Sequence, residues 1–169
     1  MVGGASTSGG ALPPATPGSQ LAALRLTLHI EANELRVQLH NPTDNPVRVW
    51  QLGNSWGGAS WSLRLREAGG TKTYTLRPSH QGYTVNLPRY IEVPPHGQQE
   101  VRLTPSRPEW TAGESLNPLR RVPLEVQAVV EIATTPESKK HLVAIGHLES
   151  APMLSPPPHS WLFATPDRH

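Results

Sequence analysis

Apolar and polar residues alternate along most of the middle of the chain. The first example starts at Leu24, after which every second residue up to Ile30 is aliphatic and the residues between are polar. The same period of two returns in 35–39, 47–50, 61–66, 74–76, 91–93, 101–103 and 122–132. This period is typical of a half-buried strand, whose side chains point to opposite faces in turn. No window has the period of 3.6 that predicts a helix.

Turn signals separate these segments, at 32–33, 40–46, 69–70, 94–97 and 135–140. Strands divided by turns every ~8–12 residues predict an all-β antiparallel fold of seven to nine strands, and a β-sandwich and a small barrel share this pattern. We also expect a last strand over 142–154 with a bulge near Gly146, and a short edge strand over 83–87. Residues 105–119 are expected to form an irregular loop with Trp110 as its anchor.

Both ends of the chain differ from this middle. Residues 1–20 contain only two large aliphatic residues besides Met1, too few to offset the entropy of ordering, so we expect a disordered lead. Residues 155–169 form a proline-rich tail, in which three successive prolines favour polyproline II geometry. The Trp-Leu-Phe triplet at 161–163 is expected either to fold back on the domain or to dock on a partner. The predicted domain therefore covers 21–154.

Composition narrows the functional classes. Charged residues make up only 17% of the chain, so charge-driven disorder is not expected for the domain. The net charge is +2 and the cations are scattered, whereas nucleic-acid binders concentrate theirs on one face, so we expect no nucleic-acid partner. The chain has no cysteine, which excludes disulfides, thiolate catalysis and zinc–thiolate sites.

Targeting signals are sparse. No stretch approaches the ~20 consecutive apolar residues that a transmembrane helix needs, so we expect no transmembrane segment. No signal peptide is recognisable after Met1. The predicted compartment is cytoplasmic if Met1 is the native start, and extracytoplasmic if a signal sequence has been removed.

Eight histidines raise the question of a metal site. Two ligands on one strand face would be two residues apart, but the chain has no His-x-His pair. His141 and His147, both expected on the last strand, would lie ~20 Å apart at ~3.3 Å per residue, which is too far for one zinc ion. We predict no metal and no other cofactor.

One short motif suggests catalysis. Residues 53–57 satisfy G-x-S-x-G, the nucleophile elbow of α/β-hydrolases, in which Ser55 would attack a carbonyl group. An elbow must open a helix, but the sequence after Gly58 has the alternation of a strand. The hydrolase hypothesis is therefore the least favoured, and we predict that the protein is not an enzyme.

Tryptophan provides the better candidate for a site. Trp50, Trp56 and Trp61 surround one glycine-rich loop, which also contains Asn54. Such a cluster either fills the core or stacks on a ligand, since tryptophan has a flat apolar face with one donor. We favour the first for Trp50 and Trp61. Alternation places Trp50 on the face opposite Val47 and Val49, so an exposed indole there is the alternative. The full set of predicted binding residues adds Trp110, Trp161 and Phe163.

Three segments together resemble immunoglobulin-like domains of the fibronectin-III and intracellular proteinase inhibitor kind. These are LRVQLHNPTDNPVRV, YIEVPPHGQQEVRLTP and VPLEVQAVVEIATTPESKKHLVAIGHLESAPM, which cover about half of the predicted domain in the expected order. The resemblance implies an immunoglobulin-like β-sandwich with a binding or scaffolding role, by analogy of fold.

Three binding functions follow from these observations. The first is a non-catalytic module for protein–protein interaction or scaffolding, so that the expected partner is another protein. The second is a protease inhibitor that presents an extended loop, for which 105–119 with Arg107 and Arg120 is the candidate. The third is a carbohydrate-binding module that uses the tryptophans. The sequence leaves the oligomeric state open.

Overall fold

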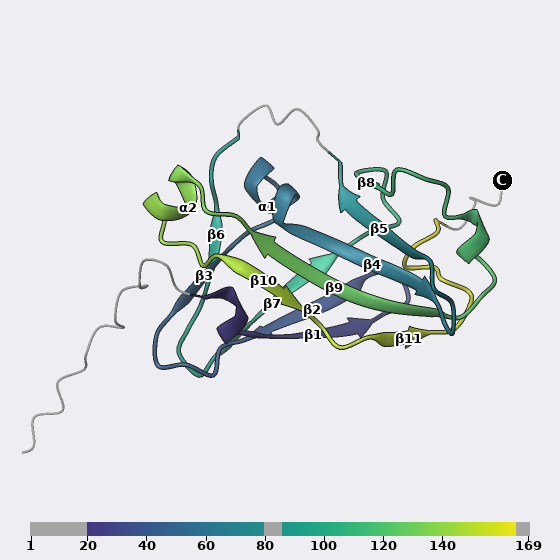
Figure 1. The fold of residues 1–169 in the computed structure, drawn as a ribbon, viewed down its shortest axis with the longest axis horizontal. Helices are drawn as coiled ribbons and strands as arrows, with labels where there is room; N and C mark the ends of the chain where they lie inside the picture. Colours follow the sequence, from purple (N-terminus) through teal and green to yellow (C-terminus); the bar gives the residue numbers. More distant parts are fainter. Residues whose placement is uncertain (1–19, 80–85, 165–169) are drawn as a thin grey trace, which may run out of the picture.

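The computed structural model describes residues 20–79 and 86–164, and it is an all-β fold in two layers (Figure 1). One layer is the antiparallel sheet β1-β2-β7, made of Arg25–Ile30, Leu35–His40 and Gln98–Leu103. Its registers place Leu28 opposite Val37 and Val37 opposite Val101. The alternating aliphatic side chains of this layer therefore form one continuous apolar face.

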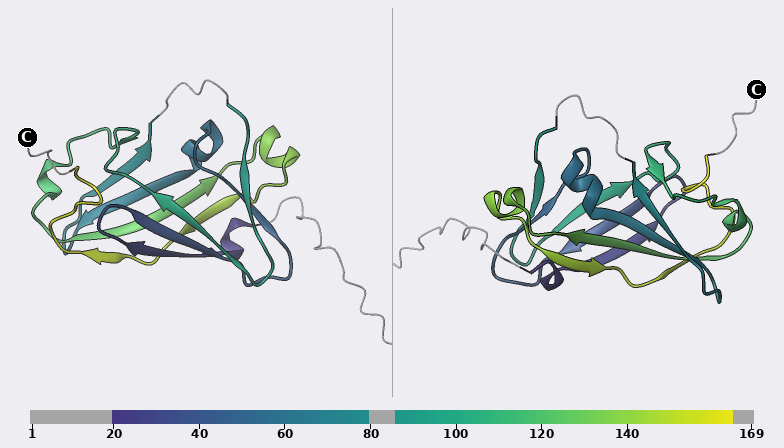
Figure 2. Two further views of the ribbon diagram at one scale, coloured as in Figure 1. Left: turned by 180° about the vertical axis from the view of Figure 1, so that it is seen from behind. Right: turned by 45° about the horizontal axis from the view of Figure 1, so that its top comes forward.

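The second layer is a larger antiparallel sheet in the order β10-β9-β4-β5-β8. Its strands are Gly146–Glu149, Leu124–Ile132, Trp61–Glu67, Thr73–Pro78 and Trp110–Thr111. A further strand, β11 (Met153–Ser155), also pairs with β9, beyond the end of β10. Figure 2 shows the two layers from behind and with the top tilted forward.

A two-stranded sheet extends the first layer. It pairs β3 (Val47–Trp50) with β6 (Tyr90–Val93). The strands β2 and β3 are one chain segment bent at 41–46, and β6 and β7 are bent at 94–97 in the same place. The buried Asn41 holds this bend, because its Nδ2 group donates hydrogen bonds to the carbonyls of Asn45 at 2.7 Å and Val93 at 3.1 Å.

Four short helical segments complete the described part of the fold. They are η1 (Leu21–Ala23), α1 (Ser55–Ser60), η2 (Asn117–Leu119) and α2 (Pro136–Lys140). Both α-helices lie at the same end of the two layers, above the ends of β9 and β4 (Figure 1). No helix within 20–79 or 86–164 is long and apolar enough to span a membrane.

The core lies between the layers and consists mainly of the residues that the alternation placed on inward faces. Leu28, Val37, Leu63 and Val126 are each at most 1% exposed. The prediction of an all-β antiparallel fold is therefore confirmed. The described residues form eleven strands, because bends or breaks divide β2 from β3, β6 from β7 and β10 from β11.

Several local predictions were wrong. The segment 135–140 is not a turn: α2 forms there, because Thr135 and Ser138 exchange side-chain-to-backbone hydrogen bonds in a capping box. The last strand does not run over 142–154. Val143 and Ile145 form only isolated bridges, β10 begins at Gly146 with a φ of 122°, and residues 150–152 divide β10 from β11. The loop 105–119 is not wholly irregular, because it contains the short strand β8.

The expected strand over 83–87 falls largely on residues 83–85, outside the described part of the chain, as does the lead 1–19.

The C-terminal segment up to Ala164 packs on the domain. Trp161 and Leu162 are 2% and 5% exposed, and both belong to the hydrophobic core. Ser155, the last residue of β11, accepts a hydrogen bond from Nε1 of Trp161 at 3.0 Å. We call residues 156–164 the C-terminal strap.

Candidate functional site

A groove of about 380 Å³ lies at the end of the molecule that carries the two short α-helices. We call it the aromatic groove, because two tryptophans form part of its wall. It is lined by Trp50, Trp56, Ala59, Ser60, Arg77, Glu131, Ile132, Ala133 and Thr135. These residues come from β3, α1, β5, the end of β9 and the residue before α2.

Two buried indoles form the base of the groove region. Trp50 is 2% exposed, and Trp61 is fully buried. Nε1 of Trp61 donates a hydrogen bond to the carbonyl of Trp50 at 2.9 Å, so the buried indole nitrogen is satisfied. Trp56, which is only partly buried, stacks at a tilt on Trp50 with 5.9 Å between ring centroids. Trp56 therefore offers aromatic surface to a ligand from a rigid support.

The helix α1 sets the position of Trp56. Asn54 is its N-cap, and the Oδ1 atom of Asn54 accepts the N–H of Gly57 at 2.9 Å. A Cβ atom at Gly57 would lie 1.8 Å from the carbonyl oxygen of Gln51, so only glycine fits there. Asn86 fixes the start of the helix by hydrogen bonds with the N–H and hydroxyl of Ser55, at 3.0 and 2.8 Å.

The segment that follows α2 closes the other side of Trp50. The imidazole of His141 meets the indole edge to face at 5.9 Å and lies 6.1 Å from the ring of Tyr90. Arg48 joins these elements: it donates to the carbonyl of His141 at 2.9 Å, pairs with Glu92 at 2.9 Å and covers the ring of Tyr90 at 4.4 Å. These contacts explain why Trp50 is buried.

The groove carries charge of both signs. Arg77 forms no ion pair with any residue in the described ranges. Glu131 lies 3.7 Å from His147, and its side chain is 73% exposed. Farther along the outer face of the sheet, hydrogen bonds from His147 and Arg64 hold the pKa of Glu149 below its usual value.

The predicted binding residues do not form one site. Trp50 and Trp56 line the aromatic groove, and Asn54 and Trp61 support it from within the fold. Trp50 and Trp61 lie in the core, as favoured from the sequence. The alternative of an exposed Trp50 was wrong, because Trp56 and His141 cover the outer side of the indole. The remaining three residues lie elsewhere: Trp110 on β8, and Trp161 and Phe163 in the C-terminal strap.

Trp110 lines a second depression of about 370 Å³, beside the ends of β5 and β7. The loop that contains Trp110 is tied to its surroundings. Ser79 donates its N–H to the carbonyl of Glu109, and Lys72 pairs with Glu114 at 2.9 Å. This loop is therefore compact and not extended.

The argument against a nucleophile elbow was wrong in one respect, because a helix does begin at Ser55. The preceding strand β3 pairs antiparallel with β6, whereas an elbow requires a parallel sheet. The hydroxyl of Ser55 accepts its hydrogen bond from Asn86, an amide that cannot act as a general base. Within the described ranges, no group of three metal-ligating side chains comes together.

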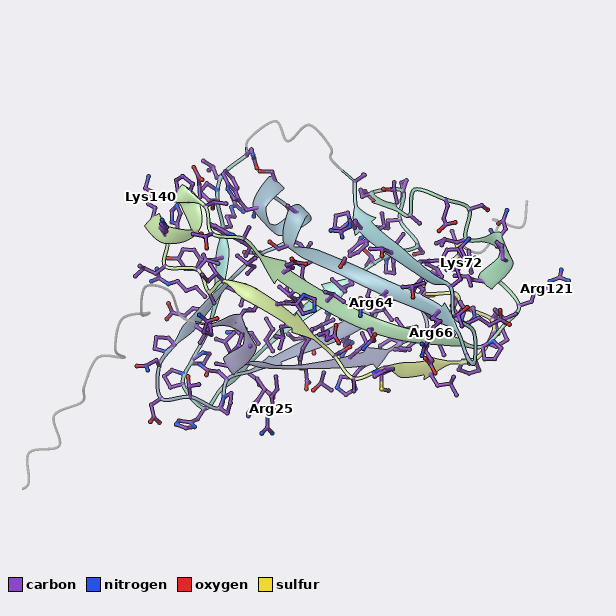
Figure 3. All side chains as sticks on the ribbon, viewed as in Figure 1. Arg25, Arg64, Arg66, Lys72, Arg121 and Lys140 are labelled. Atoms are coloured by element: carbon purple, nitrogen blue, oxygen red, sulfur yellow. The ribbon has the colours of Figure 1, made fainter. Side chains whose placement is uncertain are left out.

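The cations are spread over the molecule (Figure 3). Lys140 lies on α2, Arg64 and Arg66 lie along β4, and Arg121 projects from the opposite end. Arg64 and Arg66 are paired with Glu149 and Glu125 respectively. The outer face of the larger sheet is therefore a mixed surface, not a basic one.

Comparison of the chain with protein-family models, with curated proteins and with solved structures gave no match.

Proposed function

We propose that the protein is a non-catalytic module that binds a protein partner, and that the aromatic groove receives an extended peptide segment of that partner. The observation that carries this proposal is the position of Trp56, partly exposed beside a buried tryptophan and beside Arg77. Aromatic residues that are held rigidly lose little entropy on binding, and they recur at the centres of protein interfaces.

The charges of the groove define the peptide further. Trp56 favours an apolar or aromatic side chain, and Arg77 favours an acidic one. The registers place the Cα atoms of Arg77 and Glu131 two strands apart and offset by two residues, or ~12 Å at the usual sheet spacings. That separation corresponds to about three to four residues of an extended chain.

Selection from a library of random linear peptides displayed on phage tests this proposal. Enriched peptides are expected to carry an aromatic and an acidic residue, and to bind Trp56→Ala and Arg77→Gln variants at least about ten-fold more weakly. Trp110→Ala is the matched control, because Trp110 is also partly buried but lines the other depression. No enrichment, or an equal loss with the control, would refute the proposal.

Carbohydrate binding is the second candidate, and the same indole supports it. Trp56 has polar neighbours in Ser60, Thr135 and Glu131, as a sugar site requires. The peptide is preferred because Trp50 and Trp61 are buried, so a single ring remains for stacking. Binding on a glycan array that Trp56→Ala abolishes would favour the sugar instead.

The protease-inhibitor hypothesis ranks below both, since the loop at 105–119 is compact. Arg107 is exposed, but the loop carbonyl of Arg107 accepts the N–H of Trp110 at 3.1 Å, which bends the chain there. Inhibition of a panel of serine and cysteine proteases, lost on Arg107→Ala, would reverse this order.

We also infer that the sandwich is immunoglobulin-like. When each bent or broken strand is counted once and the two-residue β8 is left aside, the described residues form seven strands: the first, second and fifth form one sheet, and the third, fourth, sixth and seventh form the other. Immunoglobulin-type sandwiches likewise divide strands A, B and E from C, F and G. An experimental structure with a different division of these strands would contradict the inference.

A further inference from the structure

The strand β7 is an open edge of its sheet. It pairs with β2 on one side only, and Gln98, Glu100 and Arg102 are exposed along its six residues. The opposite sheet ends differently: β8 has two residues, and the segment 150–152 interrupts the edge formed by β10 and β11. An uninterrupted edge presents a row of backbone donors and acceptors to another strand.

The hydrogen-bonding phase of the sheet shows which groups of β7 point outward. Asn41 donates its N–H to the carbonyl of Gly97 at 2.9 Å, which continues the register of β2 with β7 by one residue. Bonded and non-bonded pairs alternate along an antiparallel ladder. The β7 residues that bond to β2 are therefore Gln99, Val101 and Leu103.

The bond from Glu31 to the carbonyl of Glu34, at 2.9 Å, confirms this phase from the other side of β2. Because bonded pairs alternate, the N–H and C=O groups of Arg36, Gln38 and His40 bond to β1. Those of Leu35, Val37 and Leu39 therefore bond to β7. On β7, the N–H and C=O groups of Gln98, Glu100 and Arg102 therefore point away from the sheet.

We propose that β7 pairs with β7 of a second copy of this chain, antiparallel, about a two-fold axis at Val101. In this register Glu100 of each copy lies opposite Arg102 of the other. Both residues have outward backbone groups, so each of the two pairs forms two backbone hydrogen bonds and one cross-strand ion pair. Gln98 lies opposite Thr104 of the second copy.

The other face of the strand fits the same axis. Val101 is only partly buried, and Gln99 is exposed although it shares the inward face with Leu103. The opposite sheet therefore does not cover this rim. Pairing about the axis would bring the two Val101 side chains together as a non-hydrogen-bonded pair, which is the closer kind, with ~4.5 Å between Cα atoms.

The charges support a second copy as the partner. A protective edge usually carries lysines or other like charges, which repel an identical strand. Here the signs alternate, with Glu100 and Arg102 one on each side of the axis, so the strand is complementary to itself. Arg102 lies 3.5 Å from Glu100 and 3.9 Å from Glu34 of its own chain, and its side chain is 62% exposed, so it can exchange these contacts for one with the second copy.

A single introduced cysteine tests the register directly, because the chain has none of its own. Val101→Cys is expected to form a disulfide-linked dimer under mild oxidation, since ~4.5 Å is within the roughly 4.4–6.8 Å that disulfides span. Gln99→Cys is the matched control, because the two thiols introduced by that substitution would be offset by about four positions along the paired strands, or ~13 Å. Equal or faster cross-linking of the Gln99→Cys variant would overturn the proposal.

Charge exchange supplies the second test, in sedimentation-velocity runs over a concentration series. Wild-type protein is expected to form a dimer, and Glu100→Arg or Arg102→Glu to lower its association constant about ten-fold or more by placing like charges opposite each other. The double variant should restore association, because it exchanges the partners. A monomeric wild type, or a double variant weaker than either single one, would refute the pairing.

Discussion

At the scale of residues, the aromatic groove depends on one glycine as much as on its indoles. Gly57 lets α1 approach the backbone of Gln51, which brings Trp56 over Trp50. Asn54, three residues before Gly57, caps the helix from a buried position. The groove is thus fixed by packing and capping within the short connection between β3 and β4, and connections of this kind often carry binding residues on a rigid scaffold.

Replacement of Gly57 by alanine is expected to destabilise the fold by about 2–3 kcal/mol, because backbone atoms of Gln51 must move to admit the methyl group. Gly113→Ala is the comparison: a Cβ there meets no atom within 4 Å, so only its positive φ of 64° adds cost, about 1 kcal/mol. Urea unfolding of both variants measures the difference. Equal losses would contradict the packing described for α1.

Glu149 should titrate below its usual range, chiefly because of the hydrogen bond with His147 and then because of Arg64. A carboxylate with a lowered pKa stabilises the fold above its unfolded pKa, and that contribution is lost as the pH falls through the folded value. Carboxyl carbon shifts in a pH series would report the pKa. It should rise in His147→Ala more than in Arg64→Gln, and the reverse order would contradict the assignment.

At the scale of elements, a buried histidine ties the C-terminal strap to the larger sheet. Nε2 of His159 lies 2.7 Å from the carbonyl of Val122, so this nitrogen must carry the proton and donate. Nδ1 then accepts from the hydroxyl of Ser155 at 3.0 Å, and that hydroxyl accepts from Trp161. Every polar atom in this chain of bonds has a partner.

His159→Ala is expected to cost about 2–3 kcal/mol, since it leaves the buried Ser155 hydroxyl without an acceptor and the Val122 carbonyl without a donor. Ser160→Ala, which removes a more exposed hydrogen bond to Ala32, should cost about 0.5 kcal/mol. Hydrogen exchange should accelerate at the amides of Leu162 and Phe163, which donate to the carbonyl of His159. Unchanged exchange there would show that the strap does not depend on His159.

The sequence predicted the long strands because each has one buried face, and β9 shows this most clearly over nine residues. It did not predict α1 and α2, since six and five residues are too short to show a helical period and α1 contains two glycines. The strap left no periodic signal at all. Its hydrogen bonds join Val122 to His159, which are far apart in the chain.

The candidate site was only partly predictable for the same reason. The tryptophan cluster marked the right loop, but burial of Trp50 depends on His141, which comes from a distant part of the sequence. Arg77 and Glu131 gave no signal as site residues, because each is an ordinary outward residue of its strand. Their place beside Trp56 follows from sheet order, which alternation does not determine.

At the scale of the whole molecule, the two proposed binding surfaces lie at different places on the fold. The aromatic groove lies at the end that carries α1 and α2, whereas β7 lies along the rim of the smaller layer (Figures 1 and 2). Neither Glu100 nor Arg102 lines the groove. Substitutions of Glu100 or Arg102 that prevent dimerisation should therefore leave peptide affinity unchanged. Peptide binding and dimerisation can thus be tested independently of each other.

The location of peptide binding tests the central claim most directly. Amide chemical shifts of ¹⁵N-labelled protein, followed during titration with a phage-selected peptide, would map the site. The largest saturable changes are expected at Ala59, Ser60, Ala133 and Thr135, and at the indole N–H of Trp56. Largest changes within 105–119 or along β7, with the groove amides unmoved, would contradict the account.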